Sequence, residues 1–77
     1  MRYFFDIRSD QLETRDEVGI ELENEAQAHR EARRLLAEIA EDELRVSQCA
    51  MLTARVRDQS GQPIYRAVLT LEGARLQ

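Results

Sequence analysis

Apolar residues recur with the spacing of an amphipathic α-helix in one long stretch, residues 24–46, which predicts a helix over about residues 25–45. When successive residues are placed about 100° apart around an axis, six apolar side chains fall within an arc of about 100°, the width of a core-facing stripe. These six are Ala28, Ala32, Leu35, Leu36, Ile39 and Val46. Asn24 is suited to cap the N-terminus because its side-chain oxygen can accept a free backbone N–H. The stretch therefore predicts one long helix.

Charges along this stretch support the helix and indicate where it ends. Arg34 lies four residues before Glu38, and Glu41 lies four residues before Arg45, so each pair can meet on one helix face. Glu43 falls inside the apolar stripe, which predicts that the regular helix frays between residues 42 and 46.

Four stretches alternate between apolar and polar residues, as strands with one buried face do. They cover about residues 2–8, 11–15, 51–57 and 64–72. Tyr3, Phe5 and Ile7 share one face of the first strand, and we expect Leu35, Leu36 and Ile39 to pack on it and on the third strand. The last strand is partly apolar in both of its registers, as a strand covered on two sides is.

Turn residues separate these strands. Gly19 can adopt positive φ, and residues 58–61 (DQSG) match a hairpin turn with glycine in the left-handed position. The chain is thus predicted to be an α+β domain of order ββαββ spanning residues 1–77, with a flexible tail from about residue 74. One helix covers one face of a four-stranded, mainly antiparallel sheet. A right-handed crossover favours the strand order 2-1-3-4, with 2-1-4-3 as the alternative.

Two sequence blocks, residues 2–7 (RYFFDI) and 15–22 (RDEVGIEL), together with the Ala- and Arg-rich helix and the hairpin at residues 56–61, resemble a family of small uncharacterised alphaproteobacterial proteins. The resemblance extends over nearly the whole chain. It implies a cytoplasmic bacterial protein of this fold, and it implies no activity. A looser, topological likeness connects the chain to the antitoxin partners of HicA-type toxins, whose glycine-containing strand motif is missing here.

Composition narrows the function classes. A chain of 77 residues buries only ~60% of its unfolded surface, so its core is thin and dimerisation would supplement it. The formal net charge is −4 and the isoelectric point is about 4.9, which argues against a general nucleic-acid surface; all eleven basic residues are arginine. No apolar run has the length of a membrane span, and the acidic Asp6 interrupts any signal-peptide pattern at the N-terminus. We therefore expect a cytoplasmic protein without a membrane segment.

No group of residues forms a recognisable catalytic or metal-binding motif. His29 has no second histidine or nucleophile near it in sequence and is predicted to be a half-buried packing residue. Cys49, the only cysteine, is predicted to be a small apolar filler. Asp10, Asp16 and Glu17 match no calcium loop. The sequence thus predicts no catalytic residue, no cofactor and no metal, and we expect the protein not to be an enzyme.

Two function classes remain. The first is a self-associating interaction module, expected to form a homodimer through the sheet face or edge that carries Phe4, Ile64, Arg66 and Val68, with an unknown protein as a further candidate partner. The second is an antitoxin-like or nucleic-acid-associated regulator. For that class, Arg55, Arg57 and Arg66 are candidate anion contacts on an outward sheet face, with Arg75 in the tail. The competing interpretation is that these arginines pair with Asp6 across the strands.

Overall fold

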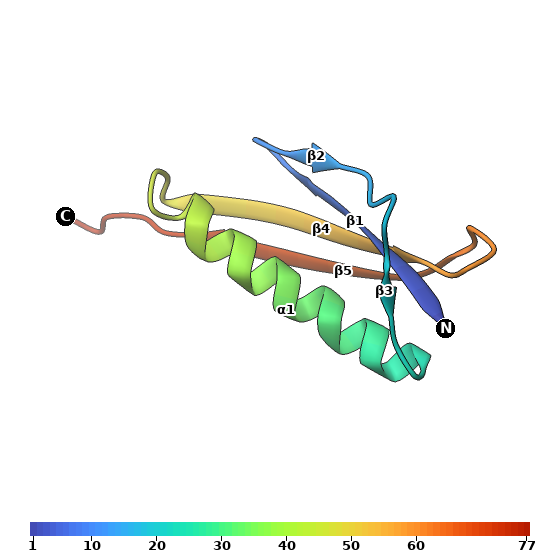
Figure 1. Cartoon of the computed structure of the whole chain (residues 1–77). Helices are drawn as coiled ribbons and strands as arrows, with labels where there is room; N and C mark the ends of the chain where they lie inside the picture. Colours follow the sequence, from blue (N-terminus) through green and yellow to red (C-terminus); the bar gives the residue numbers. More distant parts are fainter.

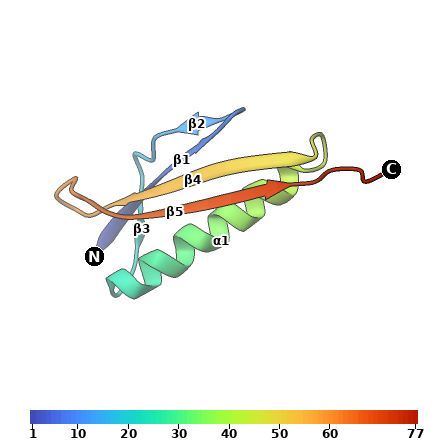
Figure 2. The same cartoon turned by 180° about the vertical axis from the view of Figure 1, so that it is seen from behind.

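The computed structural model describes residues 1–77 and contains one helix and five strands (Figure 1). Along the chain the elements are β1 (Arg2–Ser9), β2 (Glu13–Thr14), β3 (Ile20–Glu21), α1 (Glu25–Glu43), β4 (Cys49–Arg57) and β5 (Pro63–Glu72). The helix lies along one side of the sheet and the other side is open, as the view from behind shows (Figure 2). The predicted α+β class is therefore confirmed.

All strand pairs are antiparallel, and the sheet runs in the order β2-β1-β4-β5. Residues 20–21, expected to lead into the helix, instead form β3, which pairs with the first residues of β1. The predicted count of four strands is wrong for this reason, and neither predicted order contained the extra strand. The second strand is also shorter than predicted, with two paired residues in place of five.

The helix begins and ends close to the predicted residues. The Asn24 side chain accepts a hydrogen bond from the backbone N–H of Gln27 at 2.9 Å, as predicted for the cap. The regular helix ends at Glu43, whose carboxylate accepts a hydrogen bond from the Ser9 hydroxyl at 2.6 Å. Glu43 is the polar residue at the end of the apolar stripe, and this hydrogen bond joins the helix to the end of β1.

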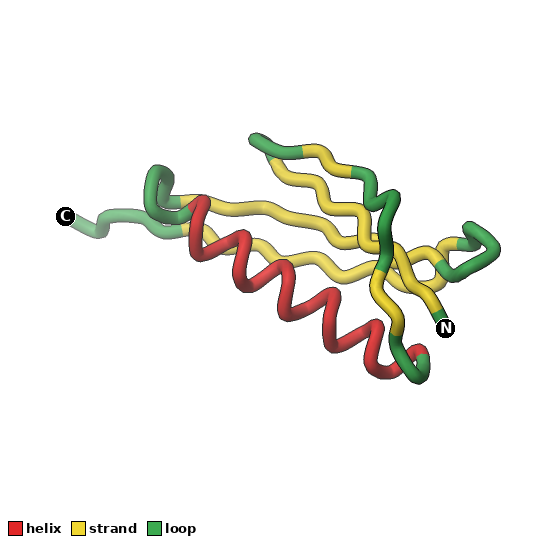
Figure 3. Tube along the Cα trace, in the orientation of Figure 1, coloured by secondary structure: helices red, strands yellow, loops and turns green.

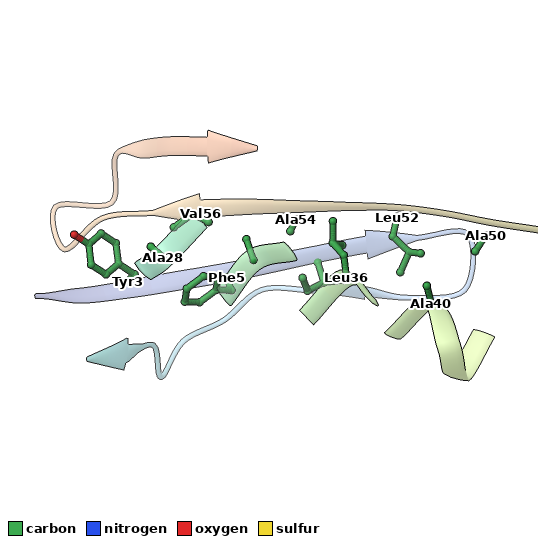
Figure 4. Packing of buried hydrophobic residues seen from close by; sticks show 11 residues of the cluster. Tyr3, Phe5, Ala28, Leu36, Ala40, Ala50, Leu52, Ala54 and Val56 are labelled. Atoms are coloured by element: carbon green, nitrogen blue, oxygen red, sulfur yellow. The ribbon is translucent and has the colours of Figure 1, made fainter. Parts of the chain in front are cut away.

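Alanine dominates the contact between α1 and the sheet. The helix residues that are buried follow each other in steps of four: Ala28, Ala32, Leu36 and Ala40. They face the buried side chains of β1 and β4, which are Tyr3, Phe5, Ile7, Ala50, Leu52, Ala54 and Val56 (Figure 4). Small side chains let the helix axis approach the sheet closely. The whole core consists of only eleven buried residues.

The larger apolar residues of the helix lie beside this line and not on it. Leu35 and Ile39 are only partly buried, although both pack against the core, and Val46 lies beyond the helix with 78% of its surface exposed. The expectation that Leu35, Leu36 and Ile39 pack on the sheet is confirmed, with Leu36 fully buried and the other two at the margin of the core. The helix does not combine its length with the apolar character that a membrane crossing needs.

The chain leaves the sheet after Glu72, and the remaining residues form no helix or strand (Figure 3). The hairpin between β4 and β5 has the predicted turn. Gly61 adopts φ +87°, and the Asp58 carboxylate accepts hydrogen bonds from the backbone N–H groups of Ser60 and Gln62. Positive φ at Gly19 (+77°) is likewise as predicted.

The different burial of Leu36 and Ile39 predicts unequal losses of stability when each is replaced by alanine. Leu36→Ala removes a side chain that is 2% exposed and should lower the free energy of unfolding by about 2–5 kcal/mol. Ile39→Ala should cost less, because part of its side chain already contacts water. Urea denaturation of both variants measures the difference. An Ile39→Ala cost equal to or above that of Leu36→Ala would contradict the packing described above.

Candidate functional site

An ion pair between neighbouring strands joins β1 to β4 on the open face. Arg57 donates from Nε to Asp6 Oδ2 at 2.8 Å and from Nη2 to Asp6 Oδ1 at 3.1 Å. Both side chains are mostly buried, with 12% and 20% of their surfaces exposed. The guanidinium also lies 5.0 Å from the centre of the Phe4 ring. Two parallel hydrogen bonds fix the relative position of the two groups, which a single contact would not do.

Asp16 extends this network to the outer edge of β1. Its carboxylate accepts hydrogen bonds from the backbone N–H groups of Phe5, Val18 and Gly19 at 3.0–3.1 Å. Its own N–H donates to Asp6 Oδ1, and its carbonyl accepts from Arg57 Nη2 at 2.7 Å. The carboxylate thus satisfies the amide of Phe5 in the gap between the short pairings of β1 with β2 and with β3.

Gly19 makes this arrangement sterically feasible. A Cβ atom at this position would lie 2.9 Å from the side chain of Arg2 and 3.0 Å from the Phe4 ring, and φ is positive. Both observations exclude most other residues here. We call the cluster of Asp6, Asp16, Gly19 and Arg57 the β1 edge network.

The acids of this network are held in their ionised form. Burial by itself raises the pKa of Asp6, but hydrogen bonds from Arg57 and the Asp16 amide, with the nearby positive charges, bring it below its ordinary value of 3.8. Burial and the negative charge of Asp6 raise the pKa of Asp16, while its three backbone hydrogen bonds outweigh them and lower it. Both carboxylates therefore stabilise the fold as anions.

A shallow depression of about 510 Å³ lies beside the network on the open face. Four of its lining residues are arginines, which come from β1, the segment after β2, β4 and β5. The lining consists of Asp6, Ile7, Arg8, Glu13, Arg15, Thr53, Arg55 and Arg66. We call this the basic depression. It contains Arg55 and Arg66, two of the three predicted anion contacts, whereas Arg57 is committed to Asp6, as the competing interpretation proposed.

A second surface lies where α1 meets β5. A groove of about 370 Å³ is lined by Arg33, Leu36, Tyr65, Ala67, Val68 and Leu69, and we call it the edge groove. Here the Tyr65 hydroxyl accepts a hydrogen bond from Arg33 at 3.1 Å. β5 is the last strand of the sheet and pairs only with β4, so its other side has no strand partner.

The structure does not bring the four predicted interface residues together. Phe4 is partly buried beneath Arg57, and β4 separates it from β5. The strand register shifts between Val56 and Arg57, which leaves Ile64 without a direct partner and packed against the core. Val68 is 57% exposed, and Arg66 is also exposed. These last two residues share the free edge strand.

His29 and Cys49 have separate environments. The His29 ring stacks on Tyr65 at 3.9 Å between ring centres, and its Nε2 lies 3.1 Å from Glu25, in agreement with the predicted packing role. Cys49 is exposed at the start of β4, so its prediction as an apolar filler is wrong. The third strand was predicted to begin at about residue 51, but β4 begins at Cys49, and residues 49 and 50 pair with β5.

Sequence reasoning missed the contribution of Asp16. A usable signal was present, because aspartate three residues before a glycine is a common pattern for a turn whose carboxylate binds the following amides. The structure places no group of three or more His, Cys, Asp or Glu side chains where they could share a metal ion.

Comparison with known proteins gives one match. A family model described as a domain of unknown function (DUF6894) matches residues 2–70, which include the whole network and nearly all of β5. Searches of curated proteins and of solved structures found no significant match.

The contacts of Asp16 predict that a small change in this side chain lowers the stability of the fold. Asp16→Asn keeps the size of the side chain but removes one acceptor oxygen and the charge, so it should lower the free energy of unfolding by roughly 1–3 kcal/mol at pH 7. Glu17→Gln, the same change at the adjacent exposed residue, should alter it by less than about 0.5 kcal/mol. Equal losses in urea denaturation would show that the Asp16 contacts contribute nothing specific.

Comparison of the wild type with Asp16→Asn also gives a prediction for how stability depends on pH. The pKa of Asp16 is lowered in the folded state, so its stabilisation is present above the unfolded value near 3.8 and is lost as pH falls through the folded value. The stability difference between the wild type and Asp16→Asn should therefore be constant near neutral pH and shrink below about pH 4. A difference that stays constant down to pH 2 or widens would contradict the assignment.

Proposed function

The chain belongs to the DUF6894 family, and from that premise we propose that it is a non-enzymatic interaction module that forms a homodimer through the free edge of β5. The observation that carries the proposal is the unequal cover of two neighbouring strands. Leu52, Ala54 and Val56 of β4 are each 0% exposed. Their direct neighbours on β5, which are Leu69, Ala67 and Tyr65, are only partly buried.

This difference arises from the position of the helix. α1 lies over β4 with its alanine line, and beyond Leu36 the floor of the edge groove is open to solvent. Apolar side chains that face the helix layer and are partly exposed to water are stabilised when another surface covers them. The stabilisation is about 25 cal/mol per Å² of surface removed from water. A partner that covers the groove would complete the core of each chain.

The free edge itself favours a strand as that partner. β5 is ten residues long and contains no lysine, and its only proline is the first residue, where a strand tolerates it. Natural edge strands are usually short, bulged or rich in lysine, because these features prevent pairing with other chains. β5 has a register shift only near its start, and over the rest of its length the charges of Arg66 and Glu72 are its only such protection.

A second copy of the chain meets both requirements. If two β5 strands pair antiparallel, the two-fold axis is perpendicular to the sheet, and both helices lie on the same side. The two edge grooves then lie next to each other, and each can be covered by side chains of the other copy. The same contact satisfies outward-facing backbone groups of both strands.

The alternative function, an antitoxin-like or nucleic-acid-associated regulator, has less support. Of its four arginines, Arg57 already binds Asp6 and Arg75 lies in the tail outside the sheet. The acidic isoelectric point of about 4.9 also opposes binding to a polyanion. The resemblance of residues 2–7 and 15–22 adds an alphaproteobacterial origin and a cytoplasmic location to the proposal.

Two lysine substitutions test the proposed contact. Wild type should have twice the chain mass of 8.9 kDa in size exclusion with light scattering at micromolar concentration. Val68→Lys places a charge on the free edge of β5 and should yield a monomer, because two like charges would meet near the symmetry axis.

Met51→Lys is the matched control for Val68→Lys. Met51 is 58% exposed on the same open face, but it lies on β4, inside the sheet. It should leave the dimer intact. A monomeric wild type would refute self-association, and dissociation by Met51→Lys alone would assign the contact to the sheet face and refute the edge.

A further inference from the structure

The basic depression contains a like-charge pair that no neighbour compensates. Arg55 of β4 lies directly opposite Arg66 of β5, and on its other side directly opposite Asp6 of β1. Residues in such positions have Cβ atoms about 4.5–5.5 Å apart, and like charges placed so are destabilising. No acidic side chain forms an ion pair within 4.0 Å of either guanidinium, whereas other arginines of the protein take part in seven ion pairs.

Asp6 cannot relieve this repulsion, although the register places it beside Arg55. Both of its oxygens accept hydrogen bonds from Arg57, and one of them also accepts from the Asp16 amide. The β1 edge network thus engages the acid that lies directly beside Arg55, and Glu13, the other acid of the lining, pairs with Arg8 at 3.5 Å. The result is a preformed positive site whose charge is not used within the chain.

We infer that the basic depression binds the phosphate group of a small molecule. The guanidinium groups of Arg55 and Arg66 can each present two N–H donors to phosphate oxygens, and this fork geometry suits phosphate and carboxylate anions. Thr53 lies in the same depression and adds a hydroxyl. The volume of about 510 Å³ lies within the range of small-molecule sites, which is about 300–1,000 Å³.

The charge of the site matches a phosphate monoester. The lining has four arginines and two acids, so its net charge is 4 − 2 = +2. A phosphate monoester carries about −1.5 to −2 near pH 7. At physiological salt, the attraction of the site is screened beyond ~8 Å. A ligand that extends farther over the surface meets a protein whose net charge is −4. A small anion is therefore accommodated, and a long polyanion is repelled by the surrounding surface.

The test measures binding of defined probes to the intact chain. Inorganic phosphate and glycerol phosphate are titrated while the Arg Nε–H signals are followed by NMR, with succinate and a short single-stranded oligonucleotide as comparison probes. Saturable binding of either phosphate probe at millimolar concentration or below, with shifts at Arg55 and Arg66, supports the site. Tighter binding of glycerol phosphate than of inorganic phosphate identifies an organic ester as the ligand type, and the reverse order identifies free phosphate.

Three glutamine substitutions complete the design. Arg55→Gln and Arg66→Gln should each weaken phosphate binding at least tenfold. Arg30→Gln removes an exposed arginine of α1 that forms no ion pair within 4.0 Å, and it should leave binding unchanged. Without ligand, Arg55→Gln should not lower the midpoint of thermal unfolding, because it removes a repulsion, and phosphate should raise the midpoint of the wild type but not of this variant.

The outcomes that overturn the inference are equally definite. They are an absence of phosphate binding at millimolar concentration, equal binding by wild type and Arg55→Gln, or binding of succinate in preference to both phosphate probes. Oligonucleotide binding that falls steeply with salt, without binding of the phosphate probes, would replace the small-molecule site with the nucleic-acid alternative. The depression is built by residues of one chain, so phosphate binding does not require a dimer.

Discussion

The Arg57–Asp6 pair, with Asp16 bound to both residues, is the contact on which the N-terminal half of the structure depends. β1 has few local partners, because β2 and β3 each contribute only two paired residues. The Asp16 carboxylate closes the gap between them, and Arg57 ties the result to β4, a strand that follows the helix in sequence. Long-range charge-assisted hydrogen bonds thus do what a continuous edge strand does in other sheets.

The same contact shapes both proposed surfaces. Because Arg57 binds Asp6 and lies over Phe4, neither the charge of Asp6 nor the Phe4 ring is left free on the open face. The basic depression keeps four other arginines, and the edge groove beside β5 is mostly apolar. The ion pair thus decides which charges remain available on the open face of a chain with only eleven buried residues.

The sequence contained enough information for the local structure and too little for the contacts between distant segments. The Asn24 cap and the Arg34–Glu38 pair, 2.7 Å in length, follow from spacing within one helix, and both are present. β3 was missed because two residues carry no periodic pattern, and their pairing depends on where β1 lies. The central place of alanine in the packing was not foreseen, because a hydrophobic arc draws attention to large side chains, while alanine lets the backbone approach more closely.

The same limit applied to the sites. Arg55, Arg57 and Arg66 were identified as a group from alternation in their strands, yet only the register and the reach of each side chain decide which of them binds Asp6. Phe4 was assigned to an interface because it breaks the apolar alternation of its strand. The covering Arg57 lies more than fifty residues away, and no local pattern indicates it.

The interrupted outer edge of β1 also limits how the protein can assemble. That side of the sheet ends in a two-residue strand, a carboxylate and a second two-residue strand, so it offers no continuous row of backbone groups to another chain. The opposite side, β5, is continuous. The sheet is therefore monovalent for strand addition: two copies that meet at β5 use up the only template each has. In the proposed dimer growth would therefore stop at a closed pair, because open-ended polymerisation along the sheet has no second continuous edge on which to continue.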